Sequence, residues 1–339
     1  MTAWDRCLVR RASGVAPSLG HPLLDGYLSF VAARARPNTV LATAYDLKVA
    51  FTVLDKDPLT VTTRDVLGFI EAQRAPRRGA NVVRLADAEA GLSARTIKRR
   101  LASLSGLYGY LLACGQVNSN PVPTGLSARR PGRPSVPLIR VPRTLPRVLE
   151  PDEVTRLLAA LRTSRDTAMV ELMVFGELRR CEVLGLRLGD LRPGEHRVFI
   201  AEGKGGHQRI VPITARFFAT LATYLDSERP SESSTDRVFV VLKGPRRGQP
   251  LSADGLDEIL DGARRRATLA HATCHELRHT CLTRLREAGM ALEAIQAQAG
   301  HASIETTRIY VHLASDRLVE EYLKTMAILD DMATEAGQP

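Results

Sequence analysis

Apolar residues at helical spacing predict two amphipathic helices in the first third of the chain. The stronger pattern covers residues 96–112, where apolar side chains recur at steps of four and three residues. These positions are Ile97, Leu101, Leu104, Tyr108 and Leu111. A weaker pattern predicts a helix around residues 39–54, which carries Tyr45 and Lys48. We therefore expect a helical N-terminal region.

The second half of the chain mixes helical and strand-like patterns. Helices are predicted from Pro151 onward, over residues 165–176 and 180–187, and from residue 254 to about 332. Short runs of branched apolar residues predict three strands, at 198–200, 209–213 and 238–241. A Gly203–Gly206 turn lies between the first two strands. The expected fold class is mainly α with a small antiparallel β-sheet.

A proline-rich segment separates the two halves. Residues 117–147 contain seven prolines interspersed with six arginines. Proline at this density excludes a helix and favours an extended, semi-rigid strap. The predicted organisation is an N-terminal extension (1–20), a helical domain (21–116), a basic linker (117–147), a second domain with a C-terminal helix (148–332) and a tail (333–339).

The composition is that of a globular protein with a basic first half. The chain has 339 residues, of which 44% are hydrophobic, and no apolar stretch has the length of a membrane span. Its five cysteines are scattered, which favours a reducing compartment, so we expect a cytoplasmic protein with no membrane partner.

The positive charge of the chain lies in its first half. The net charge is +10, and residues 1–150 hold 22 Lys and Arg against 10 Asp and Glu. Such an asymmetric charge suggests a nucleic acid as partner, and a basic surface that serves only solubility is the alternative that charge alone leaves open.

Basic residues of the 96–112 helix lie away from its apolar stripe. At 100° per residue, Arg95 and Arg99 fall opposite the stripe and Lys98 lies to one side. Such a face is either a solvated surface or a surface for a DNA groove, and the charge of this half favours DNA. The candidate DNA-contact residues are Arg95, Lys98, Arg99, Arg100, Lys48 and, from the linker, Arg143 and Arg147.

The run His275-Glu276-Leu277-Arg278-His279 allows three interpretations. As His-Glu-x-x-His on a helix, it would bind zinc with Glu276 as base, and Glu293 or His301 would be available as third ligand. Alternatively, His275 and Arg278 lie one turn apart and point to a phosphate. In the third interpretation, both histidines are buried and hydrogen-bonded.

Five motifs occur in an order that resembles the tyrosine recombinase, or phage integrase, family. They are Leu178–Glu182, Gly203–Gly205, His275–His279, Gly300–His301 and Thr307–Tyr310. The resemblance covers nearly all of the second domain, including the strand that starts at Arg209, and extends more loosely to the first. It implies a helical, SAM-like core-binding domain and a mixed α/β catalytic domain that form a C-shaped clamp on DNA.

The resemblance also implies a role for each motif residue. Arg179 and Arg278 would stabilise the charge that builds up on the phosphate oxygens, as bidentate guanidinium groups do. Tyr310 would be the nucleophile, a phenol of pKa about 10 that must lose its proton. His275 would take that proton, His301 would donate a hydrogen bond to the phosphate, and Lys204 would protonate the leaving 5′ oxygen.

The implied reaction is site-specific strand exchange on double-stranded DNA. It proceeds through a 3′-phosphotyrosine and a Holliday junction, with two protomers per duplex and a homotetramer at synapsis, and serves to integrate, excise or transpose a mobile element. Accessory DNA-bending proteins or sister recombinases are further implied partners, and a bacterial nucleoid is the implied location. No metal or ATP is required, so no cofactor is expected. The alternatives are a zinc metallopeptidase, a DNA-binding protein that lacks the chemistry, and a DNA relaxase of the type IB topoisomerase kind.

Two positions depart from the family pattern. Glu177 stands where a glycine normally precedes Leu-Arg, and Ala299 replaces the usual leucine before Gly-His. The Glu177 carboxylate is expected either to compete for the guanidinium group of Arg179 or to point away from it.

Overall fold

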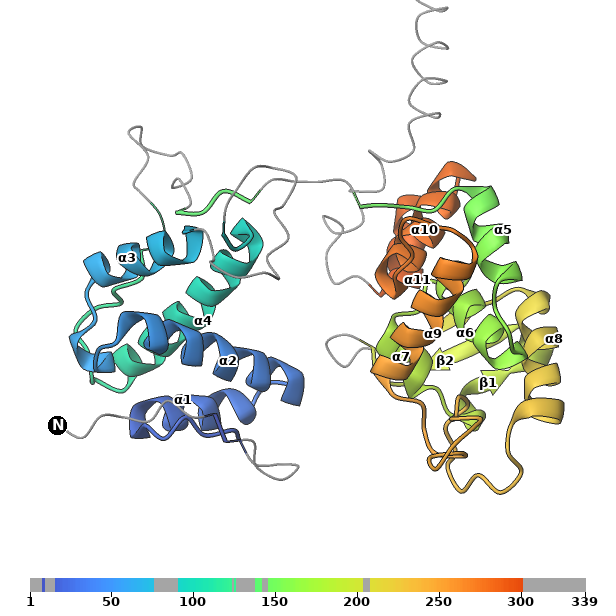
Figure 1. The fold of residues 1–339 in the computed structure, drawn as a ribbon, viewed down its shortest axis with the longest axis horizontal. Coiled ribbons are helices and arrows are strands. Elements are labelled where there is room, and N and C mark those ends of the chain that lie inside the picture. The colour runs from blue at the N-terminus through green and yellow to red at the C-terminus, as the bar shows by residue number, and fades with distance from the viewer. Residues whose placement is uncertain are drawn as a thin grey trace, which may run out of the picture. The chain divides into compact units, whose positions relative to one another are not determined.

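A computed structural model describes residues 8–9, 16–75, 91–123, 125, 138–141, 146–203 and 208–300. The chain divides into two compact units, Met1–Arg143 and Thr144–Pro339 (Figure 1). No helix among the described residues is both long enough and apolar enough to cross a membrane.

The N-terminal unit is a bundle of α-helices. Its elements are α1 (Pro22–Ala32), α2 (Pro37–Leu54), the short 3₁₀ turn η1 (Pro58–Thr60), α3 (Thr63–Arg74) and α4 (Ala94–Ala113). Helix α4 confirms the helix predicted over residues 96–112, and all five stripe residues are buried in the core of this unit. The Ser93 side chain caps α4 by accepting a hydrogen bond from the backbone N–H of Thr96. Helix α2 likewise confirms the weaker prediction.

Parts of the proline-rich segment belong to the N-terminal unit. Val122 and Ile139 are buried in its core, and Val117, Leu138 and Val141 pack against it. The described residues of this segment contain no helix, as its prolines predict. The segment is therefore more than a spacer, because its apolar residues help to cover the helical bundle.

The C-terminal unit surrounds a buried helix with further helices and a small sheet. Its elements are α5 (Pro151–Ala159), α6 (Ser164–Val174), α7 (Arg180–Gly185), η2 (Leu188–Asp190), β1 (Leu191–Arg192), η3 (Pro193–Glu195), β2 (Arg197–Ile200), β3 (Arg209–Pro212), α8 (Ala215–Thr223), the π-helical turn η5 (Tyr224–Glu228), α9 (Ala253–Arg266), α10 (Cys274–Glu287) and α11 (Leu292–Ala299). Residues 165–174 of α6 are nearly all buried, and this helix packs against α7, α8 and α10 (Figure 1). The segment that follows α6 is therefore held firmly by the core.

The sheet is antiparallel, as predicted, but one of its strands was predicted in the wrong place. Its order is β1-β2-β3, with Val198 opposite both Leu191 and Val211. Residues 238–241 are not a strand of this sheet, since Val240 forms only an isolated bridge with Pro250. Val238, Phe239 and Val240 are all buried. The apolar run thus reflects burial in the core rather than strand pairing.

The helical regions also differ in extent from the prediction. Helix α6 ends at Val174, two residues early, and α7 ends at Gly185. The region after residue 254 is interrupted at 267–273 and at 288–291. The predicted helices beyond residue 300 lie outside the described residues.

Gly176 has no room for a side chain. A Cβ atom at this position would lie 2.0 Å from Ile213 Cδ1 and 2.9 Å from the carbonyl oxygen of Leu172. We predict that Gly176→Ala lowers the free energy of unfolding by about 1–3 kcal/mol, as overpacking does in other cores. Urea denaturation measures this loss. Gly189→Ala is the matched control, since a Cβ there meets nothing within 4 Å, and equal effects of the two variants would contradict the prediction.

Candidate active site

Three arginines from separate elements of the C-terminal unit meet around one carboxylate. Arg179 precedes α7, Arg209 begins β3, and Arg278 lies in α10. We call these three residues the arginine cluster. Glu182 of α7 lies among them, and its side chain is fully buried. The structure thus brings together Arg179 and Arg278, two of the predicted catalytic residues.

Glu182 binds two members of the arginine cluster through its carboxylate. Its Oε1 accepts a hydrogen bond from Arg179 Nη1 at 2.8 Å, and its two oxygens accept a pair from Arg209, both at 2.9 Å. Arg278 Nη1 is 4.0 Å from Oε2. Burial alone would raise the pKa of Glu182, but the hydrogen bonds and charges of Arg209 and Arg179 lower it to about 2. Glu182 is therefore ionised at any physiological pH.

The C-terminal end of α11 supports the same arginines. The carbonyl oxygen of Ala299 accepts hydrogen bonds from Arg278 Nη2 at 2.9 Å and Arg179 Nη2 at 3.2 Å. The carbonyl oxygen of Gln298 accepts one from Arg209 Nε at 2.8 Å. Cations are favoured at a helix C-terminus, because its last carbonyl groups carry partial negative charge. The main chain of Ala299 fills this role, so the departure from leucine changes none of these hydrogen bonds.

Gly300 ends α11 next to the arginine cluster. It ends α11 in the left-handed conformation, with φ of 58°. A Cβ atom here would lie 3.2 Å from Arg209 Cδ, so the chain passes close to that side chain. His301 follows directly in the sequence. Its own position, like that of Lys204, Tyr310 and Arg143, lies outside the described residues.

Glu177 pairs with Arg278. Its carboxylate oxygen Oε1 lies 2.7 Å from Arg278 Nη2, and its carbonyl oxygen accepts a hydrogen bond from Arg278 Nη1. Of the two arrangements expected for Glu177, the described residues show the one without competition for Arg179, since its ion pair is with Arg278. Burial raises the pKa of Glu177 to about 8, although the arginine cluster opposes this shift, and burial lowers the pKa of Arg278.

The histidines of α10 form a pair. The Nε2 atoms of His275 and His279 are 2.9 Å apart, and burial, with His275 and Arg278 nearby, lowers the pKa of His279 to about 4. Glu276 is engaged elsewhere, because its carboxylate accepts a hydrogen bond from the backbone N–H of Thr273 at 2.8 Å and completes a capping box. Among the described residues, no three His, Cys, Asp or Glu side chains are grouped as metal ligands. Of the two candidate third zinc ligands, Glu293 is not grouped with these histidines, and His301 lies outside the described residues.

The predicted DNA-contact residues of α4 fall into two groups. Arg95 and Lys98 are exposed. Arg99 is also exposed, but its guanidinium group pairs with the buried carboxylate of Asp46 at 2.8 Å. The Arg100 side chain is only 12% exposed and donates to Gln73. Two of the basic residues on α4, Arg99 and Arg100, therefore stabilise the helical bundle.

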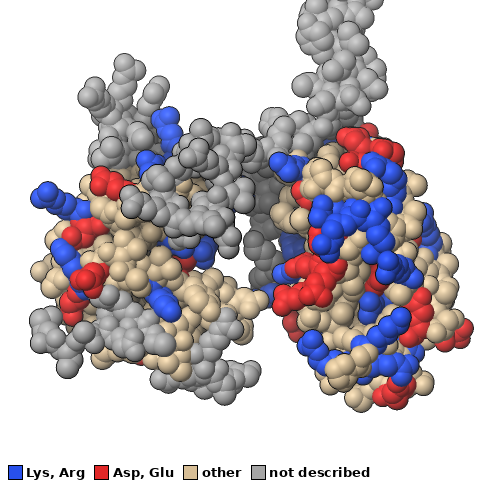
Figure 2. All heavy atoms as spheres, viewed as in Figure 1, with Lys and Arg blue, Asp and Glu red and all other residues tan. Residues whose placement is uncertain are grey.

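Lys48 and Arg147 complete the described DNA-contact candidates. Lys48 lies on α2 and is partly exposed, and Arg147 is exposed just before α5. On the face of the C-terminal unit that Figure 2 shows, basic and acidic side chains are interspersed.

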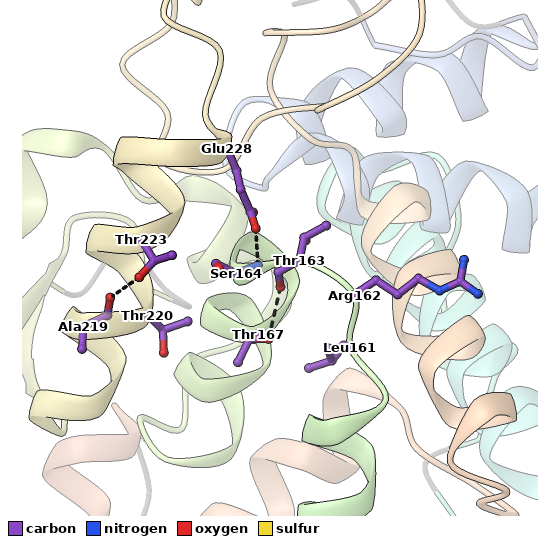
Figure 3. A pocket seen from close by; sticks show the side chains of 9 residues that line it. All are labelled: Leu161, Arg162, Thr163, Ser164, Thr167, Ala219, Thr220, Thr223 and Glu228. Atoms are coloured by element: carbon purple, nitrogen blue, oxygen red, sulfur yellow. Dashed lines mark hydrogen bonds between the residues drawn. The ribbon is translucent and has the colours of Figure 1, made fainter.

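A pocket of the C-terminal unit lies apart from the arginine cluster (Figure 3). None of its lining residues belongs to that cluster. Glu228 caps α6 there, since its carboxylate accepts hydrogen bonds from the backbone N–H groups of Ser164 at 2.7 Å and Arg165 at 3.0 Å. The carboxylate of Glu228 thus already supplies an anion at the N-terminus of α6.

Two site residues were missed as such by the sequence analysis. Arg209 was noted only as the start of a strand, and Glu182 only as part of a motif. Each is a charged residue that directly precedes an apolar run of the sequence, 210–213 or 183–186, and that combination was the available signal.

The role of Glu182 predicts a pH-dependent stability. A folded-state pKa of about 2, against an ordinary 4.5, contributes about 3 kcal/mol above pH 4.5, which is lost as the pH falls toward 2. We expect Glu182→Gln to lower the free energy of unfolding by about 3–5 kcal/mol at pH 7, because it leaves buried arginines without their partner. The difference from the wild type should shrink toward pH 2. Urea denaturation between pH 2 and pH 7 measures this difference, and Glu258→Gln, at an exposed position, is the control. A difference that does not change with pH would show that Glu182 does not stabilise the arginine cluster through its charge.

The sequence is similar to those of known DNA recombinases. The sequence profile of the phage integrase family matches residues 147–317. Tyrosine recombinase XerD of Listeria monocytogenes serotype 4b (strain F2365) is 31% identical over 316 residues, which cover 88% of this chain and 97% of that protein. Tyrosine recombinase XerC of Pelobacter propionicus (strain DSM 2379 / NBRC 103807 / OttBd1) is 34% identical over 234 residues, or 67% of this chain and 71% of that protein.

Solved structures show the same fold. XerH site-specific recombinase bound to palindromic difH substrate, in a post-cleavage complex, matches with a TM-score of 0.63 and 21% identity over 86% of this chain and 81% of that one. A lambda integrase(75-356) dimer bound to a COC' core site matches with a TM-score of 0.61 and 19% identity over 86% and 94%. With half of its length matched by the family profile and nearly nine-tenths aligned to a relative at 31% identity, the chain belongs to the phage integrase family, the tyrosine recombinases that cleave and rejoin DNA strands.

Proposed function

We propose that this protein exchanges DNA strands at specific sites, with Tyr310 as nucleophile and the arginine cluster as the binding site of the scissile phosphate. The observation that carries this proposal is the meeting of Arg179 and Arg278 at the point where the chain enters the Gly300–His301 turn. The region matched by the family profile also contains Lys204, His301 and Tyr310.

The chemistry follows from the groups in the sequence. Tyr310 Oη attacks phosphorus and gives its proton to His275, while the 5′ oxygen leaves with a proton from Lys204. Arg179, Arg278 and a hydrogen bond from His301 stabilise the negative charge that grows on the nonbridging oxygens. The product is a 3′-phosphotyrosine, which a 5′ hydroxyl of the partner duplex attacks to rejoin the strands. Each of these steps uses only groups of the protein and the DNA.

The surroundings of His275 suit a role in proton transfer. His275 is exposed on α10, one turn from Arg278, and its Nε2 contacts that of His279. Because the pKa of His279 is lowered to about 4, this second imidazole is neutral near pH 7 and can hold its partner in one tautomer.

The proposal includes the assembly that strand exchange requires. Two protomers would bind each duplex and four would meet at synapsis, with a Holliday junction as intermediate. A lambda integrase tetramer has been solved bound to a Holliday junction, and its fold matches this chain with a TM-score of 0.61. We propose a mobile element as the substrate, and accessory DNA-bending proteins or sister recombinases as further partners.

Each unit would contribute one function to this reaction. Residues 21–116 would grip the duplex, residues 148–332 would carry out the cleavage, and the linker at 117–147 would follow the backbone between them. Arg95, Lys98, Lys48, Arg143 and Arg147 are the basic residues proposed to contact phosphates. Arg99 already pairs with Asp46, so it would contact a phosphate only in addition to this ion pair.

The nucleophile is tested by trapping. Nicked duplexes with a randomised core are incubated with the protein, and covalent protein–DNA adducts are recovered and sequenced. We expect the wild type and Tyr322→Phe to form adducts, and Tyr310→Phe to form none above background. Adducts that persist in Tyr310→Phe would show that another residue attacks the phosphate.

Exposed and buried basic residues of α4 are expected to have different roles. Lys98→Ala should weaken DNA binding and reduce the salt dependence of log K by about 1, with little change in stability. Arg100→Ala should instead destabilise the N-terminal unit, because Arg100 is largely buried and lies beside Gln73 and Asp46. Fluorescence anisotropy at several salt concentrations and thermal unfolding measure the two effects. The division fails if Lys98→Ala binds like the wild type.

A further inference from the structure

Glu177 occupies an unusual position in the backbone. It lies three residues beyond the end of α6 and adopts the left-handed conformation, with φ of 64°. A residue with a Cβ atom is disfavoured there, and glycine is the residue that suits it. The preceding residue, Gly176, is closely packed, because a Cβ atom there would lie 2.0 Å from Ile213 Cδ1. The backbone N–H of Leu178 also donates to Leu172 at 3.0 Å, which ties the segment to α6.

This backbone delivers a carboxylate to Arg278. Glu177 is fully buried, and its Oε1 lies 2.7 Å from Arg278 Nη2. Neither carboxylate oxygen has a hydrogen bond of good geometry among the described residues. The contact is thus an ion pair at short distance that does not satisfy the carboxylate fully. A buried carboxylate in this state is costly when ionised.

We propose that Glu177 is a positioning residue of the strand-exchange reaction. Its carboxylate takes the place on Arg278 that a nonbridging oxygen of the scissile phosphate would otherwise occupy. This inference rests on the proposed function of the arginine cluster. A carboxylate and a phosphate present similar pairs of oxygens to a guanidinium group, so they compete for the same donors. Phosphate binding therefore requires the Glu177 carboxylate to be neutralised or to move.

Protonation of Glu177 leaves the arginine cluster with a larger net positive charge. Arg278 and Cys281 face Glu177 from α10, Arg209 faces it from β3, and Arg179 and Glu182 face it from the start of α7. With Glu177 ionised, three guanidinium groups face two carboxylates; with Glu177 protonated, they face only Glu182. The protonated state therefore attracts a phosphodiester more strongly. By thermodynamic reciprocity, a bound phosphate also favours the protonated state.

This exchange makes the reaction sensitive to pH. Burial raises the pKa of Glu177 to about 8, so the carboxyl group is mostly neutral below that pH and ionises above it. As the pH rises through this range, the Glu177 carboxylate gains charge and holds Arg278 more tightly. Phosphate binding and cleavage should then fall off, beyond any change caused by Tyr310 or His275.

Removing the charge tests the inference. The rate of adduct formation on the trapped duplexes is measured from pH 6.5 to 9.5 for the wild type, Glu177→Gln and Glu177→Gly. We expect Glu177→Gln to match the wild type near pH 6.5 and to exceed it by about tenfold near pH 9, the size expected for one charge at close range in a partly screened site. Glu177→Gly should behave in the same way and keeps the test open if the glutamine variant does not fold.

The matched control is Glu171→Gln. Glu171 is another fully buried glutamate of this unit, and it pairs with Arg216 instead of the arginine cluster. Its pH profile should follow that of the wild type. If Glu177→Gln and the wild type keep the same rate ratio at every pH, Glu177 is only a structural residue and the inference is overturned.

A measurement without DNA cleavage separates this inference from the proposed function. The carboxyl carbon of Glu177 is followed by ¹³C NMR during a pH titration, with the signal identified by its loss in Glu177→Gln, and inorganic phosphate is the probe. We expect phosphate to shift the midpoint to higher pH. An unchanged midpoint overturns the inference even if the adducts on Tyr310 form as proposed, and a shifted midpoint supports it even if they do not.

Discussion

Three guanidinium groups packed around one buried carboxylate repel one another, and much of the C-terminal unit serves to hold them together. Glu182 accepts hydrogen bonds from two of them, and the last carbonyl groups of α11 accept hydrogen bonds from all three. The buried helix α6 fixes the segment that carries Arg179. A site that concentrates positive charge in this way is complementary to a phosphate that gains negative charge in the transition state. Structure and chemistry therefore depend on the same arrangement.

The periodic elements were the part of the fold that could be predicted from the sequence. The stripe from Ile97 to Leu111 gave α4 because one buried face at helical spacing leaves little choice of structure. The run at 238–241 misled for the opposite reason. A segment buried on both faces has no alternation, so its apolar residues show burial but not strand pairing. The actual third strand, Leu191–Arg192, has only two residues and leaves almost no pattern.

The candidate site was predicted in its motifs but not in its connections. The motif order brought Arg179, Arg278 and Gly300 into one hypothesis, and the structure brings these three together. The contacts of Arg209 with Glu182 and with α11 join residues far apart in the sequence, which no local pattern records. Likewise, the pairing of Arg99 with Asp46 depends on how α2 packs against α4. Glu177 was recognised as a departure, but its left-handed backbone decides that it faces Arg278.

The central claim is that Arg179 and Arg278 bind one scissile phosphate in front of Tyr310. It is tested most directly by a crystal structure of Tyr310→Phe bound to a DNA duplex recovered by covalent capture. The account predicts that both guanidinium groups lie about 3 Å from the nonbridging oxygens of a single phosphate, with the ring of residue 310 opposite the 5′ oxygen. A complex in which that phosphate contacts neither arginine, with Arg278 still paired to Glu177, would contradict it.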